Sequence, residues 1–117
     1  MLPNYGSGNV TVKPAWEADT ASSGDVIWGA ALAAITPNSD SQDLETKAFA
    51  TAVTVTDSHL GTVGQRLHSI DLAINNLDSL AAGDWVAMKF YRDADAAGDT
   101  MAGYANLVSL LVSYSDT

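Results

Sequence analysis

A turn followed by a strand that is apolar on both faces constrains this chain more than any other feature. Gly83-Asp84 favours a turn, because glycine reaches positive φ without steric cost and aspartate can bond its own backbone. At period two, one face of the next segment holds Val86, Met88 and Phe90. The other face holds Trp85, Ala87, Lys89 and Tyr91. A solvated face would not normally carry tryptophan and tyrosine, so we expect this second face to meet another surface.

Composition narrows the possible partners. The 117 residues are enough for one domain with its own core, and the chain has no cysteine for disulfides or thiolate metal sites. Fourteen acidic against five basic residues give a formal charge of −9, which opposes binding to phosphate backbones and anionic membranes. No apolar run reaches the length that spans a bilayer, and no leader-like segment opens the chain. We therefore expect neither nucleic acid nor a membrane as partner.

The first nine residues form a separate segment. Residues 1–9 contain glycines, a proline and no apolar periodicity, so alone they have little to bury. One interpretation is a frayed chain end. The other is an arm that orders against a partner, with Leu2, Pro3 and Tyr5 as its contacts.

The remaining chain, residues 10–117, reads as a series of short strands separated by turn formers. Besides the segment from Trp85, we expect strands over Val10–Trp16, Val26–Ile35, Ala48–Thr56, Arg66–Ile74 and Ala105–Tyr114. Pro14 cannot donate to a ladder, so it predicts that the first of these is an edge strand or bends there. Residues 75–82 are compatible with one helical turn, capped by Asn76 or Asp78. The last strand is apolar on both faces, which predicts a central position or a covering neighbour.

The Val26–Ile35 segment has a face of small residues. Ile27, Gly29 and Ala31 lie on this face, while Trp28 and Leu32 lie on the other. Small side chains let another backbone or sheet come close. A loop of the same chain could also cover them, and the pattern of one strand does not separate the two cases.

These elements predict an all-β fold. Short strands with apolar bulk on both faces must lie in two antiparallel sheets that face each other, as a β-sandwich with at most one short helical turn. A jelly-roll arrangement is our specific expectation, with an immunoglobulin-like sandwich as the alternative.

Residues suited to chemistry are sparse. Asp93 and Asp95, with Gly98 at the sixth position, resemble the start of a calcium loop, and Asp99 follows. Ala97 and Tyr104 stand where closing ligands would be needed, so we predict no metal site and retain Asp93, Asp95 and Asp99 as weak candidates only. His68 shares an apolar face with core positions and is interpreted as a core or rim histidine. No hydrolase, phosphate-loop or zinc-protease motif occurs, so we expect no enzyme and no cofactor.

A series of short motifs resembles small structural proteins of tailed bacteriophages. The series consists of Pro14-Ala15-Trp16, Ser23-Gly24-Asp25-Val26-Ile27-Trp28, Ala82-Gly83-Asp84, Tyr91-Arg92-Asp93-Ala94, Asp99-Thr100-Met101 and Leu110-Leu111-Val112-Ser113-Tyr114. The resemblance spans nearly the whole chain and implies a jelly-roll β-sandwich. The sequence departs from the family pattern at Trp85, Ala87, Gly29 and Ala31, and all four departures favour a tight contact.

The resemblance implies a capsid decoration (cement) protein on the outer surface of the virion, binding the major capsid protein. No heptad shaft of a fibre is present. We expect self-association as a homotrimer, with a two-fold dimer as the alternative. The predicted self-association contacts are Trp85, Ala87, Tyr91, Ile27, Gly29 and Ala31. The predicted capsid contacts are Leu2, Pro3 and Tyr5. The alternative function is a receptor- or glycan-binding head of a head fibre or tail fibre, with Trp16, Glu17 and Asp19 as its nearest candidates.

Overall fold

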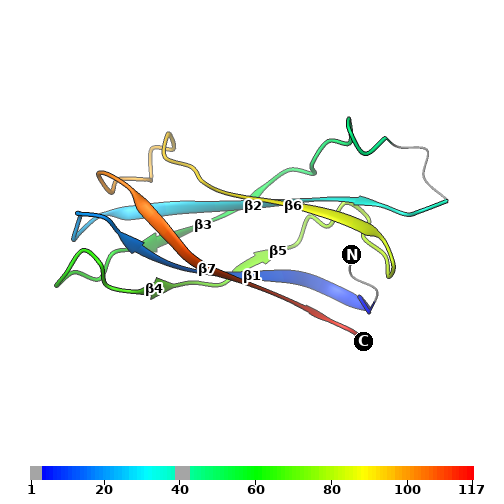
Figure 1. Cartoon of the computed structure of the whole chain (residues 1–117), viewed down its shortest axis with the longest axis horizontal. Helices are drawn as coiled ribbons and strands as arrows, with labels where there is room; N and C mark the ends of the chain where they lie inside the picture. The colour runs from blue at the N-terminus through cyan, green and yellow to red at the C-terminus, as the bar shows by residue number, and fades with distance from the viewer. Residues whose placement is uncertain (1–3, 39–42) are drawn as a thin grey trace.

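The computed structural model describes residues 4–38 and 43–117 and confirms the all-β sandwich. Two antiparallel sheets pack face to face and form an elongated molecule, seen as an upper and a lower layer in Figure 1. The strands are β1 (Ser7–Ala18), β2 (Asp25–Ile35), β3 (Val53–Ser58), β4 (His68–Ser69), β5 (Leu72–Ile74), β6 (Trp85–Arg92) and β7 (Ala105–Ser115). The described residues contain no helix.

Each sheet is built around one long strand. In the lower sheet β1 is central, with β7 along one edge and the short strands β4 and β5 along the other. In the upper sheet β2 lies between β3 and β6. Strand β3 begins at Val53 and ends at Ser58, so it starts later than the predicted Ala48–Thr56 and runs two residues further, because the regular ladder with β2 covers these residues.

Pro14 lies in an internal strand, so an edge position for β1 is wrong. The β1 residues Val10–Val12 pair with β5, and Ala15 and Trp16 pair with β4. Between these two ladders the neighbouring chain makes no strand pairs, so the predicted continuous strand Arg66–Ile74 is also wrong. The missing N–H of Pro14 is accommodated at this interruption, since no ladder hydrogen bond is required there.

The predicted helical turn over residues 75–82 is not formed. Asp78 and Ser79 have φ of 52° and 58°, which belong to the left-handed region and end any right-handed turn. Instead of capping a helix, Asp78 Oδ2 accepts hydrogen bonds from Ala34 N and from Lys47 Nζ, each at 2.9 Å. The segment of residues 75–82 is therefore joined to β2 through the Ala34 N–H.

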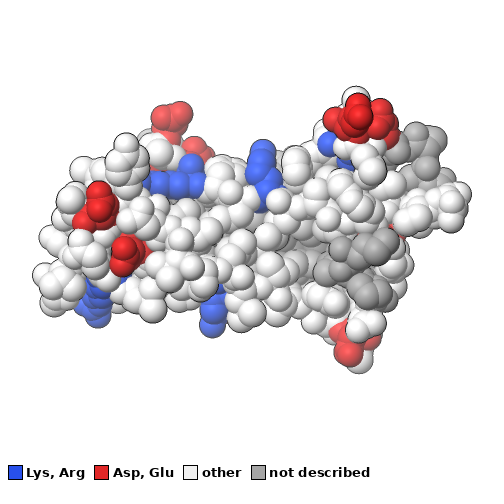
Figure 2. All heavy atoms as spheres, viewed as in Figure 1, with Lys and Arg blue, Asp and Glu red and all other residues white. Residues whose placement is uncertain are grey.

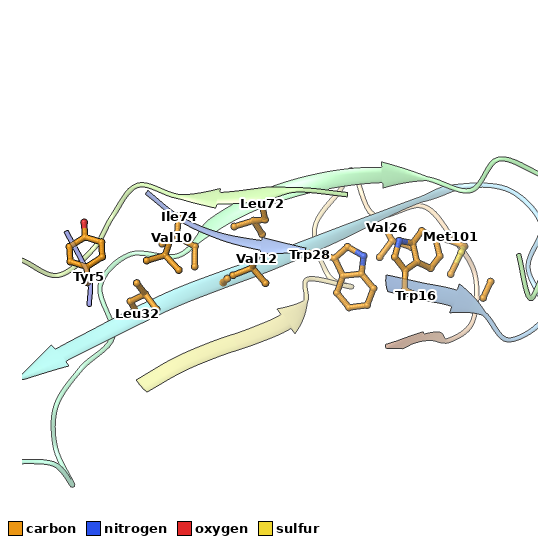
Figure 3. Packing of buried hydrophobic residues seen from close by; sticks show 12 residues of the cluster. Tyr5, Val10, Val12, Trp16, Val26, Trp28, Leu32, Leu72, Ile74 and Met101 are labelled. Atoms are coloured by element: carbon orange, nitrogen blue, oxygen red, sulfur yellow. The ribbon is translucent and has the colours of Figure 1, made fainter. Parts of the chain in front are cut away.

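The core runs the full length between the two sheets (Figure 3). At one end Trp16 and Trp28 meet edge to face, with 6.1 Å between ring centroids, and Trp28 stacks on Phe90 at 5.2 Å. At the other end smaller side chains of β1, β2 and β5 interdigitate with the ring of Tyr5. The aromatic end therefore carries most of the large buried rings.

Candidate functional site

The face predicted for self-association is partly covered by the chain itself. Gly29 pairs with Tyr91 across β2 and β6, and a Cβ at Gly29 would collide with the Tyr91 ring. Ala31 is buried opposite Lys89, whose Nζ lies 5.3 Å from the Tyr91 ring centroid and 5.5 Å from that of Phe49. Gly29 and Ala31 therefore lie beneath side chains of their own molecule.

The other three predicted self-association residues keep part of their surface. Trp85, Ala87 and Ile27 are half-buried. Trp85 and Ala87 pair with Ile35 and Ala33 on β2, so they lie on the same outer face as Tyr91. Their contact with a second molecule stays a prediction.

The predicted capsid-binding arm divides into two parts. Leu2 and Pro3 lie outside the described residues. Tyr5 is 7% exposed, packs 6.3 Å from the ring of Tyr114, and donates its hydroxyl to the carbonyl of Gly8. Its ring belongs to the core of its own chain here, and strand β1 begins only two residues later. Capsid contact by this segment stays a prediction.

The acidic loop after β6 is held by a buried ion pair. The Asp99 carboxylate accepts two hydrogen bonds from Arg92, at 2.6 and 3.0 Å, and one from Ile27 N at 2.9 Å. Burial acts to raise the pKa of Asp99, but these hydrogen bonds and the Arg92 charge outweigh it and lower the pKa. Asp93 and Asp95 do not join this network, so the carboxylates are not gathered around one point. Within the described residues no three His, Asp or Glu side chains form a metal-binding group.

Two histidines from different segments meet beside Trp16. The His68 ring stacks on Trp16 at 4.7 Å, and the His59 ring lies 4.5 Å from His68. Trp16 Nε1 donates to Asp57 Oδ2 at 2.9 Å. The sequence spacing gave no sign of this cluster, because Trp16 and Asp57 are 41 residues apart and meet only through the packing of the two sheets.

Backbone N–H groups donate a hydrogen bond to one ring nitrogen of each histidine. His68 Nε2 accepts from Leu60 N at 3.0 Å, which leaves its proton on Nδ1, a buried atom without a hydrogen-bond partner among the described residues. Burial lowers the pKa of His68, and the neighbouring His59 lowers it further, while Asp57 and the Arg66 carbonyl act in the opposite direction. His59 Nδ1 accepts from Gly61 N and its Nε2 lies 3.1 Å from the Gly64 carbonyl.

The histidine cluster supports an apolar tip at one end of the sandwich. The tip is the loop of residues 60–67, and its exposed apolar side chains are Leu60, Val63 and Leu67. Arg66 Nη1 donates to the carbonyls of Leu60 and Gly61, which closes the loop on itself. Ala18 N donates to the Gly64 carbonyl, so the loop is also joined to β1. The tip is thus an exposed apolar surface on a preformed backbone.

Strand β7 is the second exposed apolar surface. Both of its faces are largely open, and the exposed large side chains are Leu107, Val108, Leu111 and Val112. Only Ala105, Leu110 and Tyr114 are half-buried along its length. A central position for this strand is therefore wrong, because among the described strands β7 pairs with β1 alone and sits at an edge. Cover by a second molecule stays a prediction. In Figure 2 charged side chains lie mainly at the ends and margins of the molecule, while uncharged side chains fill the middle of the face.

An open hollow lies under the segment after the undescribed residues 39–42. Its lining consists of Asp43, Thr46, Lys47, Ala48, Phe49, Ala50 and Asp78. Lys47 and Asp78 already form an ion pair across it. Burial acts to raise the pKa of Asp78, but the hydrogen bonds from Ala34 N and Lys47 outweigh it and lower the pKa. The charges of Lys47 and Asp78 in this hollow are therefore already paired with each other.

The glycan-binding candidate loses its aromatic platform. Trp16 is 0% exposed, so it presents no ring on which a sugar could stack. The described residues also include no helix with the length and apolarity needed to cross a bilayer. No protein family model, curated protein or solved structure matches this chain.

Proposed function

We propose that this chain is a structural assembly subunit, and specifically a capsid decoration protein that binds the outer surface of a bacteriophage head. The single observation that carries the proposal is the apolar tip, in which exposed leucine and valine side chains stand on a hydrogen-bonded loop. Exposed apolar patches on small soluble domains mark sites of contact with other macromolecules. The resemblance of the sequence to small phage structural proteins supplies the kind of partner.

The tip is suited to a rigid contact. A loop that is already closed by Arg66 and by the two histidines loses little conformational entropy when it binds. Contact across a junction between capsid subunits would bury Leu60, Val63 and Leu67 without any reacting group. A protein that binds only the assembled shell stabilises it by mass action.

Co-sedimentation with heads of the encoding phage that lack the chain tests this role. We expect the purified chain to bind and to raise the temperature at which the heads release DNA. Leu60→Asp should weaken head binding about tenfold or more, since a carboxylate would be buried in an apolar contact. Leu44→Asp is the matched control, because Leu44 is 59% exposed and Leu60 is 66% exposed, but Leu44 lies outside the tip.

Two results would contradict the proposal. Purified virions that contain no copies of the chain by mass spectrometry would rule out a decoration role. Equal head binding by the Leu60→Asp and Leu44→Asp variants would show that the tip is not the contact. A specific hit on a glycan array with heads left unbound would favour the receptor-binding alternative.

A further inference from the structure

Strand β7 has one backbone edge that pairs with no described residue. Its ladder runs along β1 alone. The carbonyl of Ser115 accepts a hydrogen bond from Gly6 N, so it points toward β1. Successive residues of a strand point their N–H and C=O groups to opposite edges. The backbone groups of Leu110, Val112 and Tyr114 therefore point to the open edge.

From Ser109 to Ser115 this edge lacks the features that keep sheet edges from pairing. Such features are charged side chains, proline, bulges and very short strands. From Ala105 to Ser115 the strand has no charged residue and no proline. Its one irregularity near the middle is a register shift at Val108, opposite Ala15 and Trp16. From Ser109 onward β7 is a regular, uncharged strand, open for pairing.

Charge identifies a second copy of the chain as the occupant. The molecule carries −9, so most of its surface repels another copy. A basic partner would find no carboxylate on β7 to pair with. Another β7, by contrast, presents the same uncharged strand and brings no like charges into opposition.

The charge that follows the strand selects the direction of pairing. Asp116 comes directly after β7. Parallel pairing in register would place the two Asp116 carboxylates side by side. Antiparallel pairing centred on Val112 separates these residues by eight positions, or about 27 Å at 3.4 Å per residue.

We propose that two copies of the chain pair antiparallel through Ser109–Ser115, with Val112 on the two-fold axis. Leu111 of each copy then lies opposite Ser113 of the other, and Leu110 lies opposite Tyr114. The pairing joins the β1-containing sheets of both copies into one continuous sheet and uses the backbone groups at the open edge. It goes beyond the proposed viral role and does not depend on it.

Sedimentation velocity over a concentration series tests the dimer. We expect the unmodified chain to dimerise, and Leu111→Lys to raise the dimer Kd about tenfold or more, because two ammonium groups then lie on neighbouring positions of the joined sheet. Leu44→Lys is the matched control, since Leu44 is 59% exposed and Leu111 is 62% exposed, and Leu44 lies outside both the tip and β7. Both variants should keep the monomer fold, and the control should keep the dimer.

Cross-linking tests the register, because the chain has no cysteine of its own. Ser113 and Leu111 are both exposed, so single cysteines there leave the core intact. An equimolar mixture of Ser113→Cys and Leu111→Cys chains should form disulfides between unlike variants. Each variant alone should cross-link much less, since opposed residues in an antiparallel pair fall within disulfide reach and diagonal ones do not.

Three outcomes would overturn the proposal. The first is an unmodified chain that stays monomeric up to about 1 mM, a concentration at which even a weak specific contact would be populated. The second is cross-linking of like variants as efficiently as unlike ones. The third is a dimer or trimer that Trp85→Ala dissociates and Leu111→Lys leaves intact, which would place self-association on the outer face of β6.

Discussion

Strands β2 and β7 have the same length and a similarly apolar composition, yet they have opposite surroundings. Each is 11 residues long. From Trp28 onward every residue of β2 is buried, because β3 and β6 flank it and both of its faces are covered. Strand β7 has a neighbour on one edge only, and no residue of it is fully buried.

The comparison distinguishes whether an apolar strand must be buried from which molecule buries it. The apolar pattern of a strand predicts that its faces are buried. The pattern does not state whether the cover comes from the same chain or from another molecule. In β2 the chain supplies it, even over Gly29, where Tyr91 occupies the space that a side chain would fill. In β7 the chain supplies a neighbouring strand on one edge alone, and most side chains on both faces stay exposed.

Truncating one leucine in each strand gives the sharpest contrast. Leu32→Ala in β2, where the side chain is 2% exposed, should lower the free energy of unfolding by about 3 kcal/mol, since it leaves a cavity in the core. Leu111→Ala in β7 should change it by about 0.5 kcal/mol or less. Urea unfolding of dilute protein measures both, and equal losses would show that β7 is covered within the monomer.

Breaking the buried Arg92–Asp99 ion pair, which joins the end of β6 to the loop after it, should lower the stability almost as much. Asp99→Asn leaves the Arg92 guanidinium without its counter-charge, which should cost about 3 kcal/mol of unfolding free energy. Asp95→Asn, an exposed change in the same loop, is the control and should be nearly neutral. A loss of similar size in both variants would argue against a specific role for the pair.

Filling the space above Gly29 should lower the free energy of unfolding by an intermediate amount. Gly29→Ala places a methyl group where the Tyr91 ring lies, so it should cost about 1 to 2 kcal/mol by overpacking. In a Tyr91→Ala background the same change should cost much less, because the ring is gone. A double-mutant cycle by urea unfolding measures this coupling, and additive losses would contradict the contact.

Acidification should produce the smallest effect, through His68. Its pKa is lowered in the folded chain from an ordinary value of 6.5, so the unfolded chain binds a proton more readily. Stability from this group is complete above pH 6.5 and is lost as the pH falls from 6.5 to the folded-state pKa. Unfolding at several pH values should show this slope, and His68→Gln should flatten it. Identical slopes in both proteins would exclude His68 as the cause.

Strand existence and sandwich class could be predicted from the sequence because both depend on local signals. Gly24 and Gly83 have φ of 102° and 85°, as turns ahead of β2 and β6 require. Alternation then gave the faces of these strands. Segment 66–74 was less predictable, because its interruption depends on Pro14 in a strand far away along the chain.

The candidate surfaces depended on pairing that no local pattern contains. His59 and His68 lie beside Trp16, and Trp16 of β1 bonds Asp57 of β3 across the two sheets, a contact that no local pattern contains. The exposure of β7 arises because it has a neighbouring strand on one edge only, and no pattern within β7 itself reveals this. The sequence predicts a partner contact at Tyr5, because a glycine-rich segment gives no sign that this ring lies in the core.

The pairing of β1 with β7 also has a consequence for biosynthesis. Translation delivers β1 before the other strands of the sandwich, but its longest ladder needs β7, the last strand of this fold to be synthesised. The sheet of β2, β3 and β6 can form before β7 is synthesised. Until then the β1 residues Val10, Val12 and Trp16 lack their partner strand β7. Such non-local closure is slow, and it makes the interval before β7 is synthesised the time at which this fold is most exposed to misassembly.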